Sequence, residues 1–301
     1  MARLSKDVAA TRRTAAALVV LVATGVVALS VHVVLQQLAG VPFPQVADVP
    51  LWARLLRPVS ATFALMYFFR WSRVRDPRRG AISQMLWVFV AYAAMLQTLR
   101  GALMAGIVTT AVPYHVASGV GTLLSTGVLI VAVAIVTRFV RSWWTLGVIA
   151  FVVAVPKTLF LDPFVGAQVD HLITSFAGLA DHAEVYPMPY GAKILVWAYS
   201  TYVEPVAGAA LGAWMVLPAL HRLRPGLQVA AFAALSAALA AQFVPPLLWT
   251  WFMPLPLGTA FMSTFQFTLE YAVLGAGAML AVRTWQGTAE FESRAPDLRA
   301  A

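Results

Sequence analysis

Five charged side chains stand inside long apolar stretches of the sequence: Glu204, Glu270, Arg57, Arg100 and Lys157. A carboxyl group in such surroundings can give or take a proton as a general acid or base. An Arg or Lys side chain can hold an anionic group. We therefore expect Glu204 and Glu270 to be candidate catalytic residues, and the three basic residues to be candidate ligand-binding residues.

Two glutamines extend this set. Gln97 ends the run AAMLQ and Gln242 ends the run ALAAQ, so each places an amide at the end of an apolar segment. A side-chain amide offers both N–H donors and a carbonyl acceptor. We expect Gln97 and Gln242 to bind ligand together with the basic residues, and we expect no cofactor.

The composition places these residues in a membrane protein. Of the 301 residues, 61% are hydrophobic and 11% are charged, and the mean hydropathy is +0.80. Soluble domains carry about a quarter charged residues. The net charge of +9 does not indicate nucleic-acid binding, because the basic residues cluster between apolar segments. The sequence has no Cys, which excludes disulfides and thiolate metal sites.

The apolar segments predict an all-α, polytopic integral membrane protein with about eight transmembrane helices. The expected spans are 15–37, 52–70, 82–108, 115–137, 142–161, 191–219, 227–251 and 259–282. The first apolar run is longer than the hydrophobic part of a signal peptide, and no small-residue cleavage site follows it closely. We therefore interpret it as an uncleaved span.

Basic residues gather in alternate loops. The segments 1–14, 70–80, 138–141, 221–226 and 283–301 hold most of the Lys and Arg, whereas the opposite loops are rich in Pro and are acidic or neutral. By the positive-inside rule both termini are cytoplasmic. The bias toward Arg, Ala, Val and Leu is typical of bacteria, so we expect the bacterial inner membrane. The short cytoplasmic loops and the polar tail 286–301 leave no room for a nucleotide-binding domain. The expected partners are membrane lipids and, as an alternative, a partner membrane subunit.

The charged residues inside the spans lie on one side of the membrane. Counted at about 1.5 Å per residue from the nearest cytoplasmic Arg, the candidate residues lie about 20 to 31 Å deep. The hydrocarbon core is about 30 Å thick. They therefore fall between the midplane and the outer interface, which predicts a polar site that opens outward.

The two halves of the chain resemble each other. A spacing of 145 residues separates Gln97 from Gln242, Ser118 from Ser263, and Arg138 from Arg283. Four spans per unit predict a 4+4 parallel repeat within one membrane domain, with residues 1–141 as the first half and 142–285 as the second. At a spacing of 147, Arg57 corresponds to Glu204, each directly before a proline, and we expect the two side chains to meet near a pseudo-twofold axis. Pro205 is expected to kink its helix.

The longest expected loop is 162–190, on the outer side. Apolar residues between 165 and 182 recur at helical spacing, which predicts an amphipathic helix on the outer surface. Asp170-His171 and Asp181-His182 recur eleven residues apart. They are weak candidates for metal ligands, because about 16 Å would separate the two pairs. A solvated polar face is the preferred interpretation, and no metal is expected.

Three functions remain open. The first is a protein whose outward-facing site handles a lipid-linked or amphiphilic substrate, with Glu204 or Glu270 as the general acid or base if it is an enzyme. The second is a small-solute or proton-coupled transporter or permease, which the repeat and the proline-broken helices favour. The third is a non-catalytic membrane subunit or sensor. An ion-pair lock that joins the two halves would explain the same charged residues without any ligand.

Overall fold

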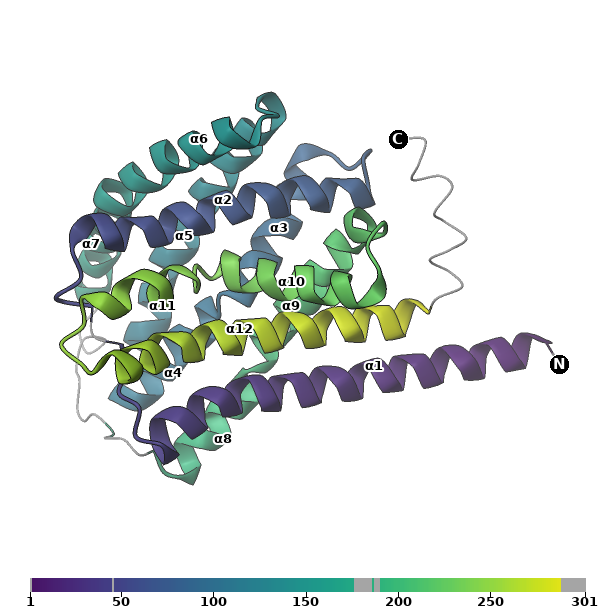
Figure 1. The fold of residues 1–301 in the computed structure, drawn as a ribbon, viewed down its shortest axis with the longest axis horizontal. Helices are drawn as coiled ribbons and strands as arrows, with labels where there is room; N and C mark the ends of the chain where they lie inside the picture. The colour runs from purple at the N-terminus through teal and green to yellow at the C-terminus, as the bar shows by residue number, and fades with distance from the viewer. Residues whose placement is uncertain (1, 45, 176–185, 187–189, 288–301) are drawn as a thin grey trace.

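The computed structural model describes residues 2–44, 46–175, 186 and 190–287 (Figure 1). Within these ranges every regular element is a helix. In chain order they are α1 (Ala2–Val33, followed by the π-helix Val34–Leu38), α2 (Leu51–Arg75), α3 (Ala81–Met95), α4 (Thr98–Thr109), α5 (Val112–Phe139), α6 (Trp143–Pro156, followed by the π-helix Lys157–Leu161), α7 (Asp162–Thr174), α8 (Ala192–Thr201), α9 (Val203–Val216, followed by the 3₁₀-helix Leu217–Leu220), α10 (Pro225–Leu239), α11 (Val244–Leu248, followed by the 3₁₀-helix Trp249–Trp251) and α12 (Leu257–Gln286).

Six helices of the described part are long and apolar enough to cross a membrane. They are Ala9–Leu38, Ala81–Thr109, Val112–Phe139, Trp143–Thr174, Ala192–Leu220 and Leu257–Gln286. The pair Pro225–Leu239 and Val244–Trp251, bent by 76°, makes a seventh if it is taken as one span. α2 has 25 residues, enough to cross about 30 Å of hydrocarbon. Its arginines lower its hydropathy, and the expected count of eight crossings stays a prediction.

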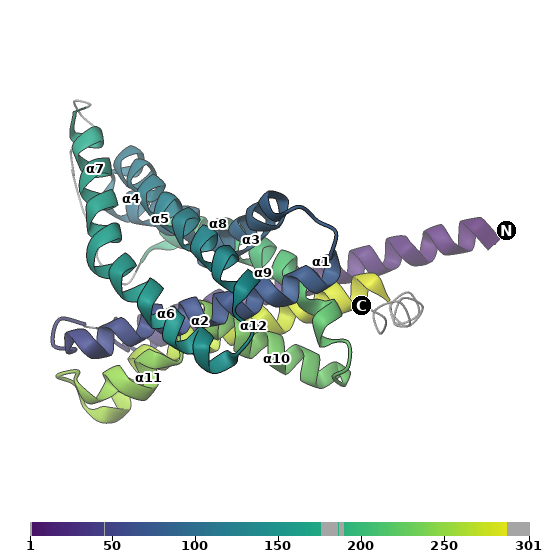
Figure 2. The same cartoon turned by 90° about the horizontal axis from the view of Figure 1, so that it is seen from above.

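The helices form one bundle in which the two halves of the chain interlock. α1 lies antiparallel beside α12, so α1 begins and α12 ends at the same end of the molecule (Figure 1). α12 also packs on α9 and α10, and α5 packs on α2, α3, α4 and α7. Across the halves, α3 packs on α9 and α10 packs on α2 (Figure 2).

The core and the outer surface are both apolar. Side chains such as Leu65, Phe68 and Phe232 are fully buried between helices. Large hydrophobic side chains on the outer faces of α1 and α6 are instead well exposed, among them Val19 at 69% and Trp144 at 70%. Apolar surface of this extent is costly in water and is suited to lipid. The fold and the surface together indicate a multi-pass membrane protein.

Three of the membrane-length segments are broken near their middle. α3 and α4 are separated at Leu96 and Gln97, and Gln97 has a left-handed backbone with φ of 59°. α8 and α9 meet at Tyr202, three residues before Pro205, and together they count as one membrane-length helix, so the kink expected at that proline stays a prediction. α10 and α11 are separated around Ala241, which is also left-handed with φ of 57°. Each break frees backbone groups and turns side chains toward the interior.

The predicted outer-surface helix over 165–182 differs from what the described residues show. α7 continues α6 through the π-helix Lys157–Leu161, and it packs against α5 instead of standing apart as a separate helix. The physical reason is that Asp162-Pro163 lies at the start of α7, where a proline is tolerated, so the helix does not end at the expected loop. The remainder of that predicted helix lies outside the described residues.

Candidate functional site

Glu270 of α12 lies at the centre of a hydrogen-bond network built from the broken helices. Its side chain is buried, and the residue is only 4% exposed. One carboxylate oxygen accepts a hydrogen bond from the Tyr202 hydroxyl at 2.7 Å and another from Nε2 of Gln97 at 3.0 Å. The other oxygen lies 3.9 Å from Nδ1 of His32. The breaks at Gln97 and Tyr202 are what direct these two side chains at α12.

Gln97 connects Glu270 to Arg100. Its carbonyl oxygen accepts a hydrogen bond from Nη1 of Arg100, while its amide donates to the carboxylate. The Arg100 guanidinium carbon also lies 4.9 Å from the centroid of the Tyr202 ring, a cation–π contact. Its Nε is buried and makes no hydrogen bond within the described part of the chain. The network therefore ends at the Arg100 guanidinium, whose Nε–H remains available as a hydrogen-bond donor.

Glu204 has a different partner from the one the sequence suggested. Its carboxylate accepts hydrogen bonds from the backbone N–H groups of Leu99, at 3.0 Å, and Arg100, in the first turn of α4. The expected ion pair between Glu204 and Arg57 does not form among the described residues, so that expectation is wrong. The break before Thr98 leaves α4 with free N–H groups and a positive dipole end, and a carboxylate is the natural partner of both.

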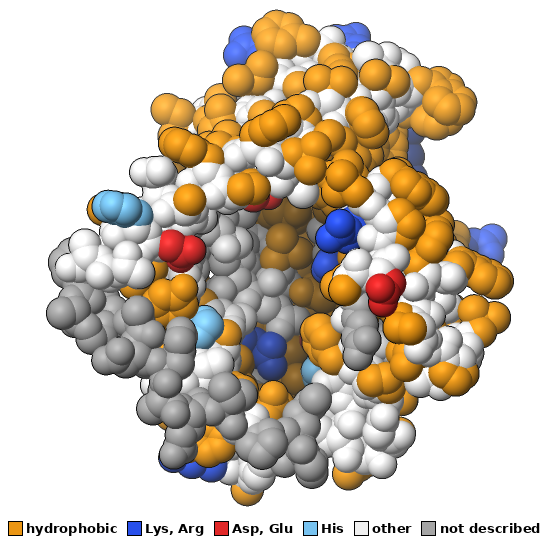
Figure 3. All heavy atoms as spheres, turned by 90° about the vertical axis from the view of Figure 1, so that its left-hand side faces the viewer, with side chains coloured by type: hydrophobic (Ala, Val, Ile, Leu, Met, Phe, Trp, Pro, Cys, Tyr) orange, Lys and Arg blue, Asp and Glu red, His pale blue; other side chains and the backbone are white. Residues whose placement is uncertain are grey.

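A cavity of about 710 Å³ surrounds this network, between α1, α4, α8 and α12, and we call it the α1–α12 cavity. Arg57, Arg100, His32 and Glu270 line it together with apolar residues such as Leu29 and others on the same helices. Figure 3 shows a hollow on the face of the molecule that holds α7, α11 and the end of α1, with basic side chains inside it. That face is the end opposite to the start of α1 (Figure 1).

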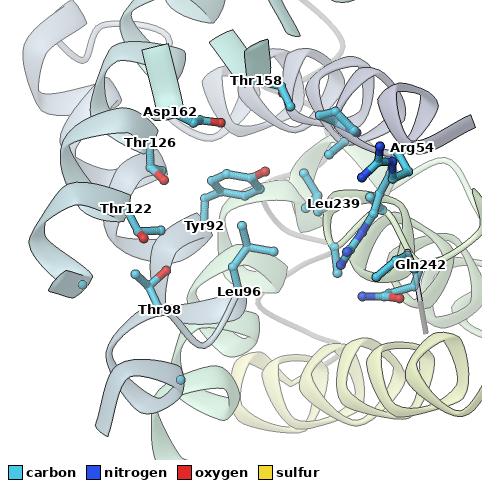
Figure 4. A pocket seen from close by; sticks show the side chains of 18 of the residues that line it. Arg54, Tyr92, Leu96, Thr98, Thr122, Thr126, Thr158, Asp162, Leu239 and Gln242 are labelled. Carbon is cyan, nitrogen blue, oxygen red and sulfur yellow. The ribbon is translucent and has the colours of Figure 1, made fainter. Parts of the chain in front are cut away.

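A second cavity, of about 930 Å³, lies between α2 and α5, and we call it the α2–α5 cavity. Arg54 and Arg57, one turn apart on α2, line it on one side (Figure 4 labels Arg54). The two cavities adjoin, because both are lined by Arg57, Gln242, Trp249 and Tyr271. The Arg57 guanidinium carbon lies 5.5 Å from the Trp249 ring centroid. Arg57 and Gln242 thus stand where the cavities join, and Arg100 reaches only the first.

Lys157 forms an ion pair with Asp162 at the wall of the α2–α5 cavity. Nζ of Lys157 donates to both carboxylate oxygens, at 2.8 and 2.9 Å, and the Ser125 hydroxyl donates to one of them. The two residues are five apart, a spacing that brings side chains together in a π-helix and not in an α-helix. The segment Lys157–Leu161 has that geometry. Lys157 is therefore held by a carboxylate and does not join the arginines.

The metal candidates do not form a site within the described residues. Asp170 and His171 lie near the end of α7, and Asp181 and His182 lie outside the part that the structure describes. In that part no group of three His, Cys, Asp or Glu side chains stands close enough together to hold a metal ion.

Several residues of these cavities were not expected from the sequence. Tyr202, Tyr271, Asp162 and His32 were not among the expected site residues. The proximity of Tyr202 to Glu204 in the chain was a usable signal, because a tyrosine at a helix break can turn its hydroxyl inward. The contact between Tyr202 and Glu270 spans 68 residues and left no local signal.

No protein-family model, curated protein or solved structure matches the chain. The fold and the surface define the class, a multi-pass helical membrane protein.

Proposed function

We propose that the two adjoining cavities bind one anionic amphiphile, a lipid-linked or lipid-like substrate, from the outer side of the membrane. The observation that carries this proposal is that Arg54, Arg57 and Arg100 line the cavities with no carboxylate within ion-pair distance among the described residues. Three described acidic groups lie nearby. Glu204 is bonded to a helix terminus, Asp162 is bonded to Lys157, and Glu270 is bonded to Tyr202 and Gln97, so none of them pairs directly with these arginines.

Uncompensated cations inside a membrane protein are costly. A guanidinium at membrane depth is tolerated when it pairs with an anion, reaches water or lines a functional cavity. Its planar set of N–H donors matches a phosphate or carboxylate in a two-point contact. An anionic group at Arg57, where the cavities join, lies within the reach of both cavities. The anionic group of the ligand supplies the negative charge that these arginines lack among the described residues.

The wall of the α1–α12 cavity favours a ligand with a hydrocarbon part. Beside its polar residues it presents apolar side chains from several helices, among them Leu29, Val33, Met104 and Phe267. Ligand sites are usually apolar with a few convergent polar groups that fix orientation. A lipid chain against these residues and an anionic head at Arg57 would satisfy both parts of the lining.

The test is a binding titration of purified protein in detergent with a fluorescent phosphatidic acid, and with the matching phosphatidylcholine as a zwitterionic reference. Arg57→Gln and Arg100→Gln should each weaken binding of the anionic lipid by about tenfold or more, because each removes charge-assisted hydrogen bonds. Arg73→Gln, at the other end of α2 on an exposed position, is the matched control. Unchanged affinity in both cavity variants, or equal binding of the two lipids, would refute the proposal.

The proposed orientation has eight membrane-embedded segments and cytoplasmic termini in a bacterial inner membrane. The membrane crossing by α2 depends most on this proposal, because two of its arginines, Arg54 and Arg57, line the cavities. The natural absence of Cys makes single-cysteine labelling direct. In intact cells a membrane-impermeant maleimide should label Asp48→Cys and spare Arg78→Cys. The reverse pattern would invert the topology and the side on which the cavities open.

A transporter is the second candidate, and one observation favours it. The two breaks with left-handed residues, Gln97 and Ala241, lie 144 residues apart and follow the same backbone pattern, with Leu96 N–H bonded to Tyr92 and Ala240 N–H bonded to Ser236. The packing of α3 on α9 and of α10 on α2 is what a pseudo-twofold axis between the proposed halves would produce. Paired broken helices at a repeat interface are typical of transporters.

Flux separates the two candidates. Purified protein in liposomes should move a fluorescent anionic lipid, or a small organic anion, between the two sides if it is a transporter. Binding without any flux supports an enzyme or a binding subunit, in which Glu270 is the group placed to exchange a proton with the ligand. Glu204 is less suited to that role, because its carboxylate is occupied at the start of α4.

A further inference from the structure

The α2–α5 cavity has a row of hydroxyl groups that their own helices do not use. A threonine in a helix can donate to a backbone carbonyl three or four residues earlier, as Thr24, Thr137 and Thr201 do. Thr122 and Thr126 on α5, and Thr158 on the π-helix, line the cavity and make no hydrogen bond within the described part of the chain. Figure 4 shows all three side chains around the same space.

The opposite sides of this cavity differ in chemistry. On the α5 side, Asp162 stands beside the threonines, with its carboxylate fixed by Lys157 and Ser125 (Figure 4). On the α2 side stand Arg54 and Arg57. Tyr92 lies between the two sides (Figure 4). One wall therefore offers hydroxyl and carboxylate groups, and the other offers guanidinium groups.

This arrangement suits a ligand that carries an anion at one end and several hydroxyl groups at the other. A hydroxyl both donates and accepts, so rows of Thr hydroxyls and a fixed carboxylate can match a polyol, whose groups also do both. An anion alone would leave the three threonines without partners. A lipid chain would leave the threonines without partners as well. It would also cover their hydroxyl groups, and burying unpaired polar groups costs free energy.

We propose that the α2–α5 cavity binds a glycosyl phosphate, with the phosphate at Arg54 and Arg57 and the sugar hydroxyls at Thr122, Thr126 and Asp162. This inference rests on the proposed function, because the same phosphate is the anionic head at Arg57. It makes the substrate a glycosyl phosphate whose lipid chain lies in the α1–α12 cavity. A soluble sugar phosphate shares the polar chemistry and lacks that chain.

The experiment compares three probes on purified protein in detergent micelles: a polyprenyl phosphate, the same lipid as its glycosyl ester, and hexose 1-phosphate. The wild-type protein should bind the glycosylated lipid about tenfold more tightly than the lipid phosphate, because several hydrogen bonds are added. Equal affinity for these two lipids would overturn the sugar assignment. Hexose 1-phosphate that competes as well as the glycosylated lipid would keep the glycosyl phosphate and reject the lipid-linked source.

Thr122→Val with Thr126→Val tests the residues, since valine keeps the shape and removes the hydroxyl. The double variant should lose about tenfold in affinity for the glycosylated lipid and nothing for the lipid phosphate. Thr158→Val, on a separate helix, provides a second variant if the double one fails to fold. Thr137→Val on α5 is the control, because its hydroxyl is bonded to its own helix. Variants that affect neither probe, or both equally, would overturn the inference.

Arg57→Gln distinguishes this failure from a failure of the proposed function. It should weaken both lipids, because both carry the phosphate. If it weakens neither, the anion site itself is wrong. If it weakens both while the threonine variants do nothing, the anion site stands and the sugar subsite is refuted.

Discussion

The hydrogen bond from Tyr202 to Glu270 should be one of the strongest single side-chain contacts in the bundle. Tyr202 is 1% exposed, Glu270 is 4% exposed, and their oxygen atoms lie 2.7 Å apart. Hydrogen bonds to a charged group contribute about 1.5–3 kcal/mol, against about 0.5–1.5 kcal/mol for neutral pairs. Tyr202→Phe should therefore lower the free energy of unfolding by about 1.5–3 kcal/mol, because it removes the donor without creating a large cavity.

Tyr199→Phe is the matched control. Tyr199 lies one turn earlier on α8, and its hydroxyl pairs at 2.9 Å with the neutral hydroxyl of Ser30. The same atom is removed, so the expected loss is about 0.5–1.5 kcal/mol. Equilibrium unfolding in detergent micelles measures both, and a double-mutant cycle with Glu270→Gln isolates the Tyr202–Glu270 coupling.

The reasoning is refuted if Tyr202→Phe costs no more than Tyr199→Phe, or if the cycle gives a coupling near zero. Either result would mean that the carboxylate draws its stabilisation from Gln97 and His32 instead. Ligand binding gives a separate readout, because Arg100 stacks on the Tyr202 ring and Phe keeps that contact. Tyr202→Phe should leave anionic-lipid affinity within about threefold of the wild type.

Three further predictions concern how the elements are held. Glu204→Gln should lower stability by about 1 kcal/mol in thermal or chemical unfolding, because a neutral amide is a weaker partner for the first turn of α4; no loss would contradict the capping role. Lys157→Met should lower the free energy of unfolding by about 1–2 kcal/mol, between the values for surface and buried ion pairs. The double variant Lys157→Met with Asp162→Asn should recover part of this loss. A double variant less stable than the single one would contradict the pairing. Gly208→Ala should destabilise the protein by about 1–3 kcal/mol, because the new Cβ would lie 2.8 Å from the carbonyl carbon of Ala94. Gly147→Ala, whose Cβ would lie 3.9 Å from its nearest neighbour, should be neutral or stabilising. Equal effects of the two substitutions would show that α9 and α3 can separate.

The sequence was sufficient for most of the helices, because they follow from hydropathy, whereas the depth of the charged residues in the membrane stays a prediction. It placed Arg57, Arg100 and Glu270 in one region, and the structure brings them to the walls of one cavity. Glu204 shows where such reasoning stops. Its partner is a backbone terminus, and that terminus exists only because Gln97 adopts a left-handed conformation that no residue type in the run AAMLQ requires.

Lys157 and Asp162 show a second limit. Their spacing of five residues does not bring side chains together on an α-helix, so the pair is predictable only if the π-helix is known beforehand. The network around Glu270 shows a third. Its donors come from segments 68 and 173 residues away, and nothing in the local sequence connects them. Contacts between broken helices far apart in the chain depend on tertiary packing, and that packing cannot be predicted from the pattern of one sequence.

The proposed duplication bears on which kind of ligand the two cavities bind. At the spacing of 145 residues Glu270 corresponds to Ser125, and each faces a polar group of another helix, His32 of α1 for Glu270 and Asp162 of α7 for Ser125. The two cavities are then counterparts that have diverged, one toward charge and the other toward hydroxyl groups. Arg57 has no such counterpart cation. When the two segments are aligned on their prolines, at a spacing of 147, Glu204 corresponds to Arg57, and Glu204 is bonded to the start of α4. A single cation between two unlike cavities calls for a ligand with one anionic centre and two unlike ends. An amphiphile with a hydroxyl-rich head has that form, and a small symmetric anion does not.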